Sequence, residues 1–470
     1  MKQIPLFGAG LTSYSAVVTR QRRLNVIYDI RKDQDRAAIV AVGTPGCRLW
    51  ITLPTYPVRG YRVVGRTLYV VAGNVLYTVS TGGIVTSLGV LATVATYVSM
   101  ADDSVTLVIA DGIAGYGVNI STGVISVIAD ANFPNGCTSV DVLNSHIIAH
   151  VPGTRKFRIS GLLAATTWSP EIYGTKENAS DLLQAIEVLN GVLILWGDTT
   201  LEQWQDVGDY PLPYDRIQGA TQLYGLAAVH SRVQVGNSTI FLGKSRDGGL
   251  KILQLVGGQI QAISDSDIEY LLSNFSVTAD AVGMAYTAYG HPIYQITFPS
   301  IPRTLAYDLS TGMWHDAQTG LTVQGRHFAN LSVAFNGLNL VSDSTTGNLY
   351  IMDEDTYTDN GVAIPREVCT RHIRNAGNDI FLARAFFDFE TGVGSSAALD
   401  PQVMVSVSRD GGRTFGPEKR RSIGAVGDYV KRVTLNRLGQ GFDLVLKIRV
   451  TDSVKFVICG GSAEIESVNG

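Results

Sequence analysis

The sequence predicts an all-β protein: a β-propeller of about seven blades followed by a C-terminal β-sandwich-like domain. Short stretches in which apolar and polar side chains alternate recur along most of the chain, as in half-buried strands. Turns of the Ser/Thr-Gly type separate many of these stretches. The chain also has 50 glycines and 20 tyrosines against six methionines, which favours many turns and strands that carry aromatic rings.

The clearest hairpin is LAYDLSTGMW, residues 305–314. Its apolar side chains alternate, Gly312 can take a positive φ in the turn, and a tryptophan begins the return strand. The same order of strand, Ser-Thr-Gly turn and strand occurs at residues 116–124 and 76–84. Recurrence of this hairpin predicts a repeat fold.

The repeats have a regular spacing of roughly 40 to 55 residues, close to that of four-stranded propeller blades. Seven units can be placed, and six is the alternative because the unit at Phe157 is the weakest match. The units are centred near Tyr77, Tyr116, Phe157, Leu201, Ile252, Tyr307 and Tyr350.

Changes in this pattern predict three parts. Residues 1–60 form an N-terminal arm and entry strand, 61–362 the β-propeller and 363–470 the sandwich-like domain. Within the arm, Leu24–Ile30 is strand-like with no hairpin partner beside it. A polar, turn-rich passage before Pro365 marks the second boundary.

Two stretches of the predicted propeller have helical spacing. Lys176–Leu189 predicts at most a short helix. Ser264–Phe275 predicts a better one, with Ser264 or Asp265 as the cap and an apolar stripe packed on a sheet edge.

The last part predicts five longer strands. In Leu444–Val450, apolar residues alternate with Val445, Lys447 and Arg449, which predicts one buried face and one largely solvated face. The five predicted strands are Ala385–Glu390, Gln402–Ser408, Tyr429–Leu435, Leu444–Val450 and Lys455–Cys459.

Bulk composition limits the function. The 470 residues are 45% hydrophobic and 17% charged, with a net charge of −4, so there is no basic excess to bind nucleic acid. Residues 366–470 hold 15 basic and 12 acidic residues, which leaves 22 and 29 for the rest, so these parts carry +3 and −7. The four cysteines are far apart and form no CxxC pair, which argues against a zinc site or a redox pair.

The N-terminus has no basic region followed by an apolar one, so no secretory signal is expected. The most apolar stretch, Ile186–Trp196, is too short and too interrupted to cross a membrane. We expect a soluble protein made in the cytoplasm.

One motif has a known structural role. Residues 408–415, SRDGGRTF, resemble the Asp box of sialidase-type propellers, in which an aspartate accepts hydrogen bonds across a tight turn. Ser245–Gly249 repeats half of it. The motif stabilises a turn and does no chemistry.

No catalytic, cofactor-binding or metal-ligating residue is predicted, and no cofactor is expected. A glycosidase would need two carboxylates at a defined separation. The acidic pairs Asp102-Asp103, Asp265/Asp267 and 353–355 all sit where turns or helix caps use acids. His146 and His150 share a strand face but lie about 13 Å apart, too far for one metal ion.

Basic residues gather on two stretches of the last part, Lys419-Arg-Arg421 and Lys431-Arg432. They could form a strip that faces DNA phosphates or an acidic neighbouring subunit, or simply a solvated hairpin face.

The order of several stretches resembles the packaged-DNA stabilisation proteins, or tail hub (nozzle) proteins, of short-tailed bacteriophages. The resemblance rests on the strand at residues 24–28 before the turn at 43–46, on WGDTTLEQW at 196–204, and on the strand and capped helix at 260–275. It continues in Tyr307-Asp308 and in the basic strand that ends at Arg432.

This resemblance implies a structural virion protein that is not an enzyme. Members form a hexameric ring below the portal-adaptor complex. The ring extends the DNA channel and helps to close it with a tail needle or plug. Tailspikes or fibres attach around it, and DNA passes through without sequence-specific binding. The resemblance carries over no catalytic residues. A glycan-binding or glycan-hydrolysing propeller protein of sialidase type is the alternative.

Overall fold

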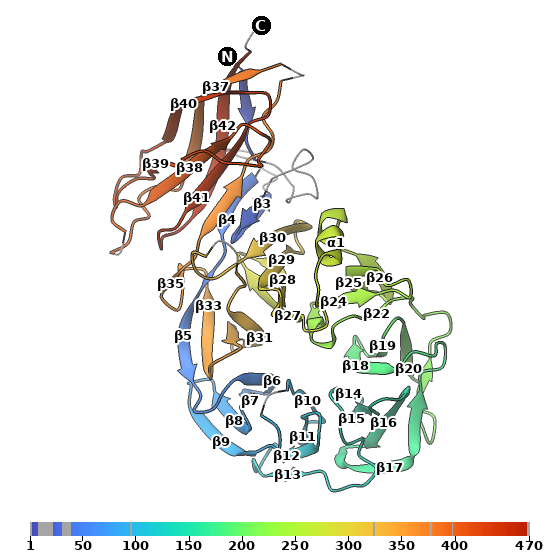
Figure 1. The fold of residues 1–470 in the computed structure, drawn as a ribbon. Coiled ribbons are helices and arrows are strands. Elements are labelled where there is room, and N and C mark those ends of the chain that lie inside the picture. Colours follow the sequence, from blue (N-terminus) through green and yellow to red (C-terminus); the bar gives the residue numbers. More distant parts are fainter. Residues whose placement is uncertain are drawn as a thin grey trace.

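The computed structural model describes residues 2–7, 22–30, 39–94, 96–322, 325–375, 378–396 and 398–467. The chain forms a ring of small sheets with a two-layered body beside it, and both described ends of the chain lie in that second body (Figure 1). The fold is almost entirely β, as predicted. Gly8–Gly10 and the charged passage 31–36 lie outside these residues.

Within the described residues, seven four-stranded antiparallel units follow one another around the ring. Their bounds, in chain order, are β6 (Val58–Val64), β7 (Thr67–Ala72), β8 (Val75–Ser80) and β9 (Val85–Val90); β10 (Ser99–Asp102), β11 (Thr106–Ala110), β12 (Gly115–Asn119) and β13 (Ile125–Val127); β14 (Val140–Leu143), β15 (His146–His150), β16 (Lys156–Gly161) and β17 (Ala164–Thr175); β18 (Leu183–Leu189), β19 (Val192–Gly197), β20 (Leu201–Asp206) and β21 (Tyr214–Arg216); β22 (Gly225–Leu226), β24 (Ser238–Lys244), β25 (Leu250–Val256) and β26 (Gln259–Ala262), with β23 (Val233–Val235) beside β24; β27 (Val282–Ala288), β28 (His291–Phe298), β29 (Arg303–Asp308) and β30 (Met313–Ala317); and β31 (Ala329–Phe335), β32 (Leu338–Asp343), β33 (Asn348–Asp353) and β5 (Gly46–Thr52).

The predicted repeat positions match strands of these units, because each predicted centre lies in the third strand of its unit. Second strands such as β7 and β19 are buried almost throughout. They lack strict alternation because each unit packs against a neighbour on both faces. Trp196 on β19 and Phe241 on β24, for example, meet edge to face with ring centroids 4.6 Å apart.

Strand β5 closes the ring. It precedes the first unit in the chain and pairs antiparallel with β33. The last unit therefore combines three strands that follow the sixth unit with one strand that precedes the first. Gly46 at its start allows a close approach, since a Cβ there would lie 2.5 Å from the carbonyl oxygens of Thr356 and Thr358. β34 (Thr358–Asp359) and β35 (Val362–Ala363) extend this sheet beyond β5.

One predicted helix is confirmed and the other is wrong. α1 (Ser266–Ser273) begins after Asp265, whose carboxylate accepts from the N–H groups of residues 267 and 268 as a helix cap does. Lys176–Leu189 contains no helix, and its second half is β18. This strand is buried on both faces, so its apolar residues fall by coincidence at helical intervals.

The second body is a β-sandwich, as predicted. One layer holds β3 (Val26–Ile30), β4 (Ile39–Gly43), β42 (Val457–Ser467), β37 (Ile380–Phe389) and β40 (Val433–Gly441), with β1 (Lys2–Pro5) also paired to β42. The other holds β2 (Arg23–Leu24), β36 (Arg366–Cys369), β41 (Val445–Val450), β38 (Gln402–Ser408) and β39 (Lys419–Ser422).

The two layers share one core of buried side chains. Leu446, Ile448 and Val450 of β41 lie in this core, whereas Lys447 and Arg449 are half-exposed, as predicted for a two-faced strand. Val445, predicted to lie on the solvated face, is buried. The prediction that the strand at 24–30 has no hairpin partner is wrong. β3 pairs with β4 over five residues, and β4 then pairs with β42.

Candidate functional site

The joint between propeller and sandwich is built by a continuous nine-stranded sheet. Four of its strands, β27 to β30, are a propeller unit, and four others, β36, β41, β38 and β39, belong to the sandwich. The two-residue strand β2 lies between them, parallel to β30 and antiparallel to β36. Because sheet hydrogen bonds cross from one domain to the other, the joint resists hinge motion.

Asn25 holds the centre of this joint. Its φ of 53° bends the chain between β2 and β3, and Asn tolerates this left-handed conformation better than most residues. Its side-chain amide donates to the carbonyl oxygens of Gln318 and Pro365, both at 2.8 Å. Its Oδ1 accepts from the Gln318 N–H at 2.8 Å. One buried side chain therefore ties the arm, the end of β30 and the segment before β36 together.

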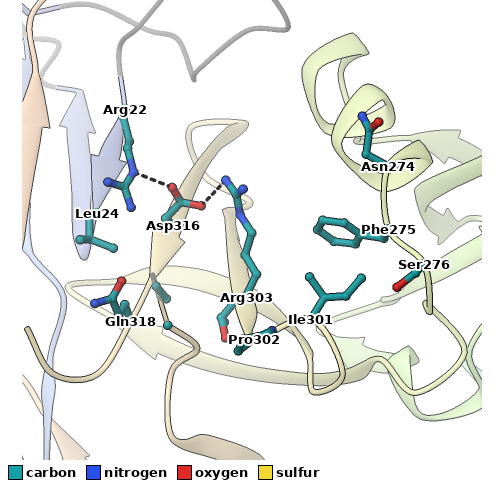
Figure 2. Close-up of a pocket in the computed structure, with 13 residues that line it drawn as sticks. Arg22, Leu24, Asn274, Phe275, Ser276, Ile301, Pro302, Arg303, Asp316 and Gln318 are labelled. Carbon is teal, nitrogen blue, oxygen red and sulfur yellow. Dashed lines mark hydrogen bonds and ion pairs between the residues drawn. The ribbon is translucent and has the colours of Figure 1, made fainter. Parts of the chain in front are cut away.

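A cavity of about 630 Å³ lies on the propeller side of the joint, between β30, β29 and the end of α1 (Figure 2). Asp316 stands at its wall and pairs with both Arg22 and Arg303, each at 3.0 Å. Arg22 also reaches Glu367 on β36 at 3.4 Å. Burial lowers the pKa of Arg22, but Asp316 and Glu367 outweigh this and raise it. Both cationic groups of this wall are already paired with acids.

Two further arginines are buried inside the joint. The Arg23 guanidinium donates to the Trp314 carbonyl oxygen at 2.6 Å and lies 4.3 Å from the centre of the Tyr28 ring. Arg366 is 1% exposed, and burial lowers its pKa to about 10. Buried cations at this point connect backbone carbonyl groups and aromatic faces of both domains.

The axis of the propeller is narrow. It holds a cavity of about 350 Å³ lined by inner strands of several units. The rings of Tyr97 and His230 meet there, with centroids 4.5 Å apart and planes tilted by 53°. Burial, with Arg232 nearby, lowers the pKa of His230 to about 4, so this imidazole is neutral at pH 7. A space of this volume admits a small molecule at most.

The Asp-box prediction is confirmed as a turn. It follows β38 in the sandwich, where Asp410 accepts from the N–H groups of Arg413 and Thr414, both at 2.9 Å, and from the Ser408 hydroxyl at 2.6 Å. Gly411 takes a φ of 71°. Burial raises the pKa of Asp410, but these hydrogen bonds outweigh it, so the pKa lies well below its usual value. In the half motif, the Gly248 N–H donates to the Ser245 carbonyl oxygen at 3.0 Å.

The acids considered for catalysis serve as structural groups. Asp103 accepts from the N–H groups of Val105 and Thr106 in a turn. Asp102 pairs with Arg62 at 2.8 Å, and Asp353 pairs with Arg48 at 3.3 Å. Each of these carboxylates is used within its own turn or by a neighbouring strand.

The two strand histidines have separate partners: His146 Nδ1 lies 2.8 Å from the Ser160 carbonyl oxygen and His150 Nδ1 lies 3.4 Å from that of Ser139. Burial lowers the pKa of His150. The part of the chain that the structure describes contains no group of three or more His, Cys, Asp or Glu residues able to hold a metal ion. Burial raises the pKa of the Cys47 thiol strongly and that of Cys137 to about 12, so both are poor nucleophiles.

The predicted basic strip is brought together in the structure, but only half of it lies on a strand. The strand predicted at Tyr429–Leu435 begins at Val433, so Lys431 and Arg432 precede β40. Lys431 donates to the Ser422 hydroxyl of β39 at 2.7 Å, which joins the two basic stretches across a loop. Arg420 and Arg421 are exposed on β39. Arg432 pairs with Asp388 at 2.8 Å and lies over the Phe386 ring.

Sequence reasoning missed the joint itself. Asn25, Arg23 and Arg366 look like ordinary polar residues, and only their placement beside apolar strands hints at burial. None of the α-helices in the described part of the chain is long and apolar enough to span a membrane.

Comparisons with known proteins identify the family. Residues 25–357 match the model described as Bacteriophage P22 Gp10, beta-propeller, and residues 365–466 match Bacteriophage P22 Gp10, beta-sandwich. A search of curated proteins finds no match.

Solved structures share less. The extracellular domain of BT4673 from B. thetaiotaomicron has 7% identity and a TM-score of 0.44, covering 77% of this chain and 45% of that one, so this chain spans less than half of it. The WD40 propeller domain of Doa1 has 13% identity and a TM-score of 0.39, covering 65% and 96%.

The family models cover both bodies of the fold, and the structure has the propeller and the sandwich that they describe. The chain therefore belongs to the Bacteriophage P22 Gp10 family, a family of structural phage proteins.

Proposed function

We propose that the chain is a tail hub, or nozzle, subunit that forms a ring below the portal-adaptor complex of a short-tailed phage. The observation that carries this proposal is the sheet that runs unbroken from the propeller through β2 into the sandwich. A subunit that must hold its shape against DNA under pressure needs such a joint. Membership of the phage family supports a place in a phage particle.

DNA passes between copies of the chain and not through one copy. The Tyr97 and His230 rings, which contact each other, lie at the propeller axis beside a cavity of about 350 Å³. A channel for DNA must therefore lie along the axis of a ring of subunits. Mild acidity suits its wall, because dense lysine and arginine would bind the phosphates and slow the DNA.

In this proposal the protein is not an enzyme. Asp102, Asp103 and Asp353 take part in ion pairs or accept from backbone N–H groups, and the buried thiols are protonated. The ring retains packaged DNA, meets the adaptor on one side, and offers its outer surface to tailspikes or fibres and its lower end to a needle or plug. The virion tail is its place, after synthesis in the host cytoplasm.

The test uses phage particles. Antibody raised against the chain should label the tail just below the portal vertex in electron micrographs, and particles made without the chain should lose their packaged DNA. Labelled particles whose tails carry no antibody, or DNA-filled particles that are stable without the chain, would contradict the proposal.

A further inference from the structure

Two exposed loops on opposite sides of the molecule carry opposite charges. The first, here called the basic tip, is residues 419–432, which include β39 and the loop after it. It holds five basic residues and one acidic residue, a net charge of +4. Figure 1 shows β39 and β40 at the upper left, at the outer side of the sandwich.

The basic tip also exposes apolar side chains. Val430 is 96% exposed and Tyr429 is 74% exposed, next to the half-exposed Val426. The loop is supported from behind, since the Val426 N–H donates to the Leu399 carbonyl oxygen at 3.0 Å. A supported loop that shows large apolar groups to solvent is typical of a contact surface.

The second surface, here called the acidic loop, is residues 205–216 in the fourth propeller unit. It consists of the end of β20, the connection 207–213 and the strand β21. It holds three aspartates and one arginine, a net charge of −2. Tyr210, in the middle of this loop, is 94% exposed, and Val207 is also exposed. β20 lies at the right of the propeller in Figure 1, on the side of the molecule away from β39.

Asp206 accepts hydrogen bonds from the Asn144 amide and the Gly208 N–H, and Asp215 accepts one from the Arg216 N–H. Among the described residues, Asp206, Asp209 and Asp215 take part in no ion pair. The same holds for Arg420 and Arg421 on the basic tip.

We infer that the basic tip of one copy binds the acidic loop of a second copy of this chain. The charges are complementary, and each side adds an exposed tyrosine and valine that lose contact with water on binding. Because the two surfaces differ and lie on opposite sides of the molecule, the contact is head-to-tail. Repeated contacts of this kind close into a ring or continue as a filament.

This inference rests on the proposed function and adds to it the two surfaces by which the ring would assemble. Each loop is small beside a standard interface of about 20–30 residues per side. The single contact is therefore weak, and ring closure strengthens it because every copy uses both surfaces at once.

The test measures association of the full chain by sedimentation velocity at low and high ionic strength. We expect the wild type to associate at low ionic strength and to dissociate as salt screens the exposed charges. Two charge-reversal variants, R420E/R421E and D209K/D215K, should each associate about tenfold to a hundredfold more weakly.

Mixing provides the decisive control. R420E/R421E brings the basic tip to a net charge of 0, and D209K/D215K brings the acidic loop to +2, so neither variant should bind itself. The unchanged acidic loop of the first variant can still bind the unchanged basic tip of the second. An equimolar mixture should therefore associate again. The matched control, R409E/R413E, makes the same change of charge on exposed arginines of the Asp-box turn and should associate as the wild type does.

Circular dichroism and the thermal midpoint confirm that each variant is folded. A wild type that stays monomeric at low ionic strength, variants that associate normally, a mixture that does not recover, or a control that fails equally would each overturn the contact. The tail-hub proposal is judged separately by antibody labelling of particles, so tails that carry the chain while the variants assemble normally would reject these surfaces alone.

Discussion

Replacing Asn25 by alanine tests the joint most sharply within one chain. The substitution removes three buried hydrogen bonds, each of 2.8 Å, and leaves two carbonyl groups and one N–H without their partner. At about 1–3 kcal/mol for each unpaired buried group, and with some relief from entering water, the loss is about 3–6 kcal/mol. Alanine at a φ of 53° adds about 1 kcal/mol.

The assay is thermal unfolding followed by circular dichroism and calorimetry. For a chain of 470 residues that unfolds as one unit, the entropy of unfolding is about 1 kcal/mol per kelvin. N25A should therefore lower the midpoint by about 4–7 °C. Asn25→Gly removes the same hydrogen bonds without the backbone strain, so its unfolding midpoint should fall about 1 °C less than that of N25A.

The matched control is Asn336→Ala. Asn336 also has a positive φ, of 50°, but it lies exposed in the turn between β31 and β32. Its replacement should cost only the strain, about 1 °C. If N25A shifted the midpoint no more than N336A does, the hydrogen bonds of Asn25 would not stabilise the joint and the reasoning would be refuted.

Three further changes probe other parts of the fold. Asp181→Ala leaves the fully buried Lys176 ammonium without its carboxylate partner at 2.5 Å and should lower the free energy of unfolding by about 3–5 kcal/mol. The double variant K176M/D181A removes both charges and should recover part of this loss. Equal losses in the two variants would argue against a buried ion pair. Gly46→Ala at the closing strand should cost about 1–3 kcal/mol in urea unfolding, whereas Gly249→Ala, where a Cβ meets its nearest atom at 3.5 Å, should be near neutral. Asp410→Asn should lower the thermal unfolding midpoint at pH 7. Because the pKa of Asp410 is depressed in the folded protein, the difference in midpoint between variant and wild type should shrink as pH falls below about 4. A difference that does not depend on pH would contradict this.

Local patterns predicted much of the fold. In hairpins such as residues 305–314, ten consecutive residues contain the signals for both strands and the turn. The third strand of each unit could therefore be located from sequence. The same holds for α1, whose cap and acidic first turn are local. The strand β18 was mistaken for a short helix because burial on both faces removes the period of two.

Long-range pairing could not be predicted in this way. β5 pairs with β33, and β1 pairs with β42 at the opposite end of the chain, through backbone hydrogen bonds that depend on no particular side chain. Asn25 and Arg366 defy the usual rule that polar residues are exposed, because their partners are carbonyl groups distant in sequence. The joint is a product of these non-local contacts. The boundaries at residues 60 and 362 stay predictions.

The central claim is that this chain is a rigid structural subunit of a phage tail ring. A cryo-EM reconstruction of the tail at subunit resolution tests it most directly. We predict a ring of this chain below the portal and its adaptor, with the sheet continuous from β27 through β2 to β39 in every copy. A tail that lacks the chain, or copies in which the propeller and the sandwich adopt different relative orientations, would contradict the claim.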